Sequence, residues 1–188
     1  MGLTIKRLAP ELAKTFVEFF EGLDFEHSPH WASCYCMAYH VDCSQEQWQS
    51  RTGEDNRRDA FELIKEGRMM GYLAFDGEQC VGWCNANDAQ RYLRLKKEMQ
   101  PVVGDRRIGC VLCFVIHPNY RNQGLARKLL EQAVQDFQAD DYEAVLALPV
   151  DIKANPQTLY RGTINMYTEL GFKEIERHGD LRVMWLDL

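Results

Sequence analysis

The chain has 188 residues, of which 46% are hydrophobic and 27% charged, as expected for a globular protein with one well-buried core. Its net charge of −6 argues against nucleic acid or an anionic membrane as the main partner, because both need a basic surface. The sequence contains neither a run of about 20 apolar residues, as a membrane span requires, nor an N-terminal signal peptide. We therefore expect residues 1–188 to form a single cytoplasmic domain.

The first half of the chain predicts one strand, two helices and a β-hairpin. Alternating apolar and polar residues indicate the strand, and apolar residues on one face indicate the first helix. Asp76-Gly77 lies between two apolar runs, which is among the strongest sequence signals of a hairpin. The predicted elements are a strand at 3–8, helices from Pro10 and over 53–67, hairpin strands at 70–75 and 79–85, and a basic, exposed loop or short helix at 91–97.

Between the two helices, residues 25–48 lack a clear period and are rich in aromatic, cysteine and histidine side chains. We interpret this segment as an irregular insertion that forms a substrate-side wall. A zinc-binding interaction module is an alternative, because Cys34, Cys36, His40 and Cys43 offer three sulfurs and an imidazole. Their spacing is not that of common zinc fingers, and an odd number of cysteines, seven, favours packed, reduced thiols. We therefore expect no metal.

An apolar strand, a polar turn and an amphipathic helix form the centre of the second half. Residues 110–116 carry no charge, which is typical of a central strand buried on both faces. Apolar residues then recur on one helical face from Leu125 to Phe137. The turn between them therefore places a helix N-terminus at the carboxyl end of a central strand. Free backbone amides there favour an anion such as a phosphate.

The remaining residues predict one more strand, a helix and a final hairpin. Residues 142–148 form a short apolar strand, which the intervening helix would place parallel to the central strand. Pro156 precedes a helix that runs to Leu170, with Gly171 as its C-cap. Strands at 172–177 and 181–186 then close around Gly179-Asp180.

The turn before the central helix, Arg121 to Ala126, has the form R-x-x-G-x-A. It resembles the acyl-CoA diphosphate loop of the GNAT N-acetyltransferases, although an ordinary glycine-containing turn is the alternative. The predicted order of strands and helices is also that of this family, over nearly the whole chain. The resemblance implies an α/β fold with a mixed sheet of six to seven strands and about four helices. It also implies transfer of an acetyl group from acetyl-CoA to a primary amine of a small molecule or peptide by direct attack.

The resemblance further implies where acetyl-CoA binds. Its pantetheine arm would lie along the backbone of the central strand, and its diphosphate on the amides of the turn, where Gly124 and Ala126 leave room. Arg121 would add charge, whereas Arg127 and Lys128 would either face the nucleotide 3′-phosphate or be solvated helix charges. The predicted acetyl-CoA-binding residues are Phe114, Val115, Ile116, Arg121, Asn122, Gln123, Gly124, Leu125, Ala126 and Arg127.

Residues 165–172 match the family's Y-x-x-x-G-F ending, in which the tyrosine hydroxyl approaches the CoA sulfur as general acid. The resemblance therefore makes Tyr167 the catalytic residue. A phenol with a pKa of about 10 stays protonated at neutral pH yet can protonate a thiolate. A tyrosine merely packed at a helix end is the alternative. Many relatives carry an asparagine seven residues earlier, where this chain has Tyr160, so Asn155, Asn165 or a water would have to replace it.

The sequence does not identify a general base. Some relatives use a glutamate at the position of Cys110. The remaining candidates, besides a water chain, are Glu98, Asp88, Asp105, His40 and His117, of which His117 is expected only to shape the turn.

A ping-pong path through Cys110 or Cys113 is not expected, because apolar surroundings raise a thiol pKa. Strand alternation also predicts that these two thiols face opposite sides. A non-catalytic acyl-CoA-binding domain remains an alternative function, and the resemblance allows a homodimer. The amine acceptor is not predicted.

Overall fold

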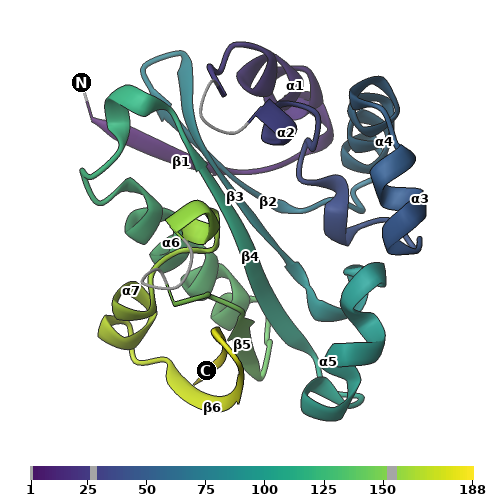
Figure 1. Cartoon of the computed structure of the whole chain (residues 1–188). Coiled ribbons are helices and arrows are strands. Elements are labelled where there is room, and N and C mark those ends of the chain that lie inside the picture. The colour runs from purple at the N-terminus through teal and green to yellow at the C-terminus, as the bar shows by residue number, and fades with distance from the viewer. Residues whose placement is uncertain (1, 26–28, 152–155) are drawn as a thin grey trace.

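A computed structural model describes residues 2–25, 29–151 and 156–188. The strands of these residues form a seven-stranded mixed sheet in the order β1-β2-β3-β4-β5-β7-β6, with helices on both faces (Figure 1). The predicted α/β fold with a mixed sheet of six to seven strands is therefore confirmed. No helix in the described parts of the chain is both long and apolar enough to cross a bilayer.

The strands lie close to the predicted positions, and the chain contains several short helices in addition to the expected ones. The strands are β1 Leu3–Arg7, β2 Gly71–Asp76, β3 Gln79–Asp88, β4 Ile108–Ile116, β5 Ala144–Ala147, β6 Lys173–His178 and β7 Leu181–Asp187. The α-helices are α1 Ala13–Glu21, α2 Pro29–Ala32, α3 Gln45–Ser50, α4 Gly53–Lys65, α5 Lys96–Val103, α6 Leu125–Ala139 and α7 Ile164–Glu169. The 3₁₀ turns η1 Pro10–Leu12, η2 Met37–Tyr39, η3 Ala89–Arg91, η4 Leu93–Leu95, η5 Pro118–Tyr120 and η6 Pro156–Arg161 connect them.

Strand alternation divides the core between the two faces of the sheet. Tyr72 and Ala74 of β2 pack in the cluster that contains the apolar face of α6, whereas Leu73 and Phe75 pack with α1 and α4. Figure 1 shows α6 and α7 on one side of the sheet and α1 to α4 on the other. The segment predicted as a substrate-side wall therefore lies on the face opposite α6.

The predicted strand, helix and parallel strand are confirmed as β4, α6 and β5. Gly109 of β4 allows α6 to approach the sheet closely, because a Cβ atom there would lie 2.7 Å from the ring of Phe137. Helix α6 buries five apolar side chains against the sheet: Leu125, Leu129, Leu130, Ala133 and Phe137. This packing fixes the N-terminus of α6 beside the carboxyl end of β4.

Two of the predicted segments are wrong in detail. The single helix expected from Pro156 to Leu170 is broken at Gly162, whose φ of +80° is outside the helical region, and Thr163 then caps α7 through the Met166 amide at 3.2 Å. The basic segment at 91–97 is not wholly exposed. Tyr92 is completely buried, and its hydroxyl donates to Asn85 Oδ1 at 2.9 Å.

The prediction that Cys110 and Cys113 face opposite sides is also wrong. The pairing of β3 with β4 shifts between Asn85 and Ala86, so that Asn85 pairs with Cys113 and Ala86 with Val111. This bulge adds one residue to β4 and reverses the alternation beyond it. As a result, Cys110 and Cys113 both pack on the face opposite α6, whereas Val111 and Phe114 pack with α6.

Candidate active site

Strands β4 and β5 separate halfway along β4. Their parallel pairing covers Ile108 to Val111, and no other described strand pairs with that edge of β4 beyond Val111. On its opposite edge, β4 stays paired with β3 up to Ile116, and the His117 amide donates to Val81 O at 3.0 Å. Since backbone groups alternate between edges, the N–H and C=O groups of Phe114 and Ile116 point away from β3, towards the opening. They can therefore pair with an extended ligand.

The turn after β4 presents backbone amides beside this opening. Asn122 and Gly124 have positive φ values of 58° and 76°, and Gly124 is the N-cap of α6. The Lys128 amide donates to Gly124 O at 3.1 Å and so forms the first backbone hydrogen bond of α6. The amides from Asn122 to Ala126, which precede it, have no hydrogen-bond partner among the described residues. A Cβ atom on Gly124 would meet no atom within 4 Å, so the space in front of the turn is open. This arrangement suits a diphosphate.

Side chains of the turn are fixed by contacts within the loop. Arg121 Nε donates to Ile116 O at 3.0 Å, and Gln123 Nε2 donates to Asn119 O at 2.7 Å. Arg127 is paired with Glu131 at 3.0 Å and with Glu169 of α7. Such exposed ion pairs contribute at most about 1 kcal/mol, so Arg127 can exchange these carboxylates for a phosphate. Leu125 is buried, and Ala126 is half-buried at the start of α6.

Tyr167 lies in the core beneath the opening and is 0% exposed. Its hydroxyl donates to Arg161 O at 2.8 Å, and its ring packs edge to face on Phe172 with centroids 5.2 Å apart. Burial raises the pKa of Tyr167 well above its usual value, so the phenol remains protonated at any physiological pH. A Cβ atom on Gly162 would lie 3.1 Å from the Tyr167 ring and 3.2 Å from the Phe114 ring. Tyr167 is thus close to β4 where it leaves β5.

A cavity of about 640 Å³ lies on the face of the sheet opposite α6. Cys113 and Val115 of β4 form part of its wall, and described residues between Phe25 and Trp48 form most of the remainder. Positions 26–28 of the predicted wall segment lie outside the described residues. The predicted wall segment therefore encloses a space next to the central strand. The lining residues are Phe20, Phe25, Trp31, Ser33, Cys34, Cys36, Ala38, Tyr39, Gln45, Trp48, Gln49, Arg51, Asn56, Cys113, Val115 and Tyr160.

Cys36 and His40 of the segment form contacts with other protein side chains. Cys36 Sγ lies 3.3 Å from Cys113 Sγ and accepts the indole N–H of Trp83 at 3.2 Å. His40 Nε2 contacts the side-chain amide of Asn85, and burial lowers the pKa of His40 to about 4. Within the described residues, no three His, Cys, Asp or Glu side chains are grouped to hold a metal ion.

None of the candidate bases lines the cavity. His117 Nδ1 accepts the Asn119 amide at 3.3 Å, which agrees with its expected role in shaping the turn, and Asp88 accepts the Gln90 amide at 2.8 Å. Glu98 and Asp105 are exposed. Burial raises the pKa of Cys110, which agrees with the expectation that this thiol is not a nucleophile.

Residues 33–172, which include β2 to β5 and α6, match the sequence profile of the acetyltransferase (GNAT) family. The chain belongs to the GNAT acetyltransferase family. Its membership confirms the resemblance carried by the R-x-x-G-x-A turn and by the order of the elements. A comparison with curated protein sequences finds no match.

Solved GNAT structures share this fold at low sequence identity. An arylalkylamine N-acetyltransferase-like 5b protein from a mosquito has a TM-score of 0.64 at 12% identity, with 100% of both chains covered. The PaiA N-acetyltransferase of Thermoplasma acidophilum, solved with coenzyme A, has a TM-score of 0.57 at 13% identity, again over 100% of both chains. A GNAT acetyltransferase from Streptococcus pneumoniae has a TM-score of 0.56 at 19% identity over 100% of both chains.

In this GNAT protein, Tyr160 stands seven residues before Tyr167, where the family resemblance led us to expect an asparagine. Tyr160 lies in the wall of the cavity. Its hydroxyl is 3.5 Å from that of Tyr39, and Arg161 donates to both, through Nε to Tyr160 at 3.2 Å and through Nη2 to Tyr39 at 2.8 Å. Asn165 is exposed, and Asn155 lies outside the described residues. Sequence reasoning missed Arg161, because a single arginine in an irregular segment gives no signal of its partners.

Proposed function

We propose that the protein transfers an acetyl group from acetyl-CoA to a primary amine by direct attack. The observation that carries this proposal is the separation of β4 from β5 immediately beside the free amides at the start of α6. In this proposal, residues 1–188 act as one acetyltransferase domain, with the segment from 25 to 48 as the acceptor wall. The thioester of acetyl-CoA supplies the acetyl group.

On the donor side, the chain contributes hydrogen-bond donors in fixed positions. The outward backbone groups of Phe114 and Ile116 hold the pantetheine arm as an added strand would be held, and the amides from Asn122 to Ala126 hold the diphosphate. An outward amide of β4 also donates to the carbonyl oxygen of the acetyl group as it gains charge. Because β3 already fixes β4 on its other edge, these groups need little reorganisation on binding.

We assign to Tyr167 the protonation of the departing thiolate. The proton that the attacking nitrogen loses then replaces the one given up by the phenol, so that each turnover leaves Tyr167 protonated. The Tyr167 side chain is buried near Phe114, and among the described residues its hydroxyl has one hydrogen-bond acceptor, the backbone carbonyl of Arg161. A carbonyl is a weak base compared with a thiolate, so the hydroxyl proton would turn to the sulfur as negative charge develops there. Burial, which holds the pKa of Tyr167 high, keeps this proton in place before the reaction.

A non-catalytic acyl-CoA-binding domain is the second candidate. The observation that favours it is the complete burial of Tyr167, whose hydroxyl already has an acceptor in Arg161 O. Release of free thiol from acetyl-CoA in the presence of an amine separates the two candidates. The acetyltransferase requires amine-dependent release, whereas the binding domain gives a calorimetric signal with coenzyme A and no release.

The diphosphate site is tested by Gly124→Ala, with Gly67→Ala as matched control. Gly124 and Gly67 have φ values of 76° and 67°, and a Cβ atom on either would meet no atom within 4 Å. Both variants should therefore lose similar stability, about 1–2 kcal/mol. Only the Gly124 variant places a methyl group between the turn and the diphosphate. We expect its coenzyme A affinity, measured by calorimetry, to fall about 10- to 100-fold through lost amide hydrogen bonds. Equal affinities of the two variants would refute the site.

A further inference from the structure

The described lining of the cavity beside β4 is rich in aromatic side chains and contains a positive charge but no negative one. Of the described residues that line it, none is Asp or Glu, and Arg51 is the one that is charged at neutral pH. The chain as a whole has a net charge of −6, whereas the described lining of the cavity contains one arginine and no carboxylate. A volume of about 640 Å³ is that of a site for a small organic molecule.

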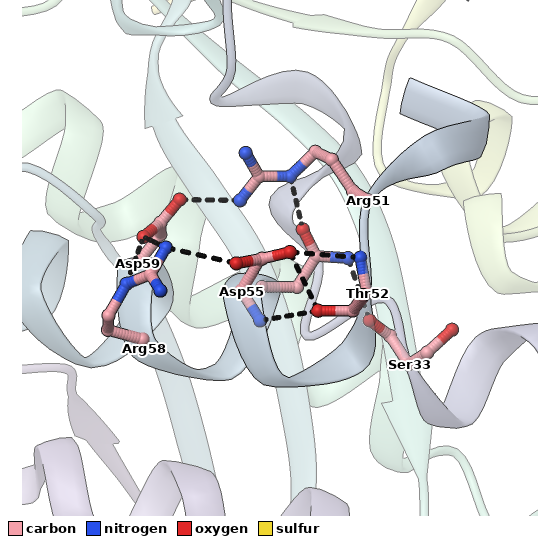
Figure 2. A network of polar contacts seen from close by, with 7 residues as sticks. Ser33, Arg51, Thr52, Asp55, Arg58 and Asp59 are labelled. Atoms are coloured by element: carbon pink, nitrogen blue, oxygen red, sulfur yellow. Dashed lines mark hydrogen bonds and ion pairs between the residues drawn. The ribbon is translucent and has the colours of Figure 1, made fainter. Parts of the chain in front are cut away.

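Arg51 is held at the junction of α3 and α4 with part of its guanidinium unused. Its Nε donates to Asn56 Oδ1 at 2.7 Å, and its Nη2 pairs with Asp59 Oδ2 at 2.5 Å (Figure 2). Its Nη1 atom has no partner among the described residues, and the side chain is 21% exposed. Asp59 is shared with Arg58, which approaches its other oxygen at 3.0 Å. The remaining N–H groups of Arg51 are thus fixed in direction and available to an anion.

Two further guanidinium groups lie against the aromatic wall. Arg94 is 5.6 Å from the ring centroid of Trp48 and donates to Ala38 O at 3.4 Å. Arg161 is 5.6 Å from the centroids of both Tyr39 and Tyr160. These rings therefore already contact cations, and the added positive charge opposes the binding of a second cationic group by the same rings.

We infer that the acceptor of the proposed acetyl transfer is an amine that also carries a carboxylate on an apolar or aromatic body, with the carboxylate bound by Arg51. The inference rests on the proposed acetyltransferase function and adds the acceptor's chemical class. The aromatic wall takes the body of the acceptor, and the amine lies towards Cys113 and Val115 on β4. A diamine or polyamine is disfavoured, because its second ammonium group would find guanidinium groups and no lining carboxylate.

Three acceptors that differ only in the group remote from the amine test this inference. They are para-carboxyphenethylamine, its methyl ester and the para-aminomethyl analogue, which carry a negative, a neutral and a positive remote group. We expect kcat/KM, measured by thiol release from acetyl-CoA, to be about 10- to 100-fold higher for the carboxylate than for the ester, and lowest for the diamine. Equal values for the carboxylate and the ester, or a preference for the diamine, would overturn the inference without the use of any variant.

Substitution of Arg51 then tests whether this residue binds the carboxylate of the acceptor. Arg51→Gln should lower kcat/KM for the carboxylate to that for the ester and leave the ester within about twofold, since the ester forms no charged hydrogen bond with Arg51. The contacts of Arg51 with Asn56 and Asp59 are lost for all three acceptors alike, so they do not change the ratio between them. Arg51→Lys, which keeps the charge without the planar fork, should retain part of the preference. Arg58→Gln is the matched control, because Arg58 pairs with the same Asp59 but does not line the cavity, and it should retain the full preference. An equal loss for carboxylate and ester in Arg51→Gln would overturn the role of Arg51.

Calorimetry with the same three amines, in the presence of coenzyme A, provides a second readout that does not need turnover. We expect the same order of affinities as for kcat/KM. If coenzyme A binds but the three amines bind equally or not at all, the acceptor class is wrong and the donor site stands. If coenzyme A itself does not bind, the proposed acetyltransferase function fails, which is a separate result.

Discussion

Replacing Tyr167 by phenylalanine removes a single oxygen atom and tests whether this residue acts as an acid. The ring is completely buried and packs on Phe172, and phenylalanine can keep this packing. What is lost is the hydrogen bond of 2.8 Å to Arg161 O. The variant therefore separates the chemistry of the hydroxyl group from the packing of the ring.

The structure allows us to estimate both the loss of stability and the loss of kcat in Tyr167→Phe. Loss of one buried hydrogen bond that leaves a carbonyl without its donor costs about 1–3 kcal/mol. For a chain of 188 residues each kcal/mol lowers Tm by about 2–4 °C, so Tm should fall by about 2–12 °C. Loss of a general acid lowers kcat about 100- to 10,000-fold, which is far more than this loss of stability can explain.

Thiol release measured across pH, together with thermal unfolding, gives the comparison. Because burial raises the pKa of Tyr167, the wild-type rate should show no alkaline loss from ionisation of this phenol below about pH 10. Tyr92→Phe is the control, since Tyr92 is also completely buried and its hydroxyl contacts Cys110 O at 3.3 Å. Tyr92→Phe should lose stability and keep its turnover. A Tyr167→Phe protein with wild-type kcat would refute the acid role.

Two further predictions concern the stability of the fold. In Gly109→Ala, the new methyl group would lie 2.7 Å from the Phe137 ring and force α6 away from the sheet, so the free energy of unfolding in urea should fall by about 1–3 kcal/mol. An unchanged unfolding midpoint would show that α6 adjusts freely. For His40, the folded-state pKa of about 4 lies below the unfolded value of about 6.5, so the unfolded chain binds more protons and stability is lost as pH falls from 6.5 towards 4. The loss between pH 7 and pH 5 should be about 2 kcal/mol smaller in His40→Gln than in the wild type, and equal losses would contradict the burial of a neutral imidazole.

Local patterns predicted the donor side of the site well. The uncharged run of β4, the glycine turn and the apolar face of α6 lie within about thirty consecutive residues, and each follows from short-range rules of strand, turn and helix formation. Gly124 has the positive φ expected of a glycine at this place, and Gly109 shows why a second glycine stands at the start of β4. Neither a bulge in β4 nor the break at Gly162 has such a signature, because each depends on how distant segments pack.

The order of the strands, the parallel pair around α6 and the resemblance to GNAT acetyltransferases could all be predicted from the sequence, because they depend on residues close together in the chain. The cavity proposed to bind the acceptor could not be predicted from the sequence, because it forms only when the chain folds. Folding brings Arg51, Tyr160 and Cys113 to one cavity and places Arg161 against Tyr39, although these residues are separated by up to 122 positions. It also buries Tyr167 with its hydroxyl on a backbone carbonyl. The charge of a cavity depends on which side chains come together from distant parts of the chain. Local sequence patterns do not indicate such long-range contacts.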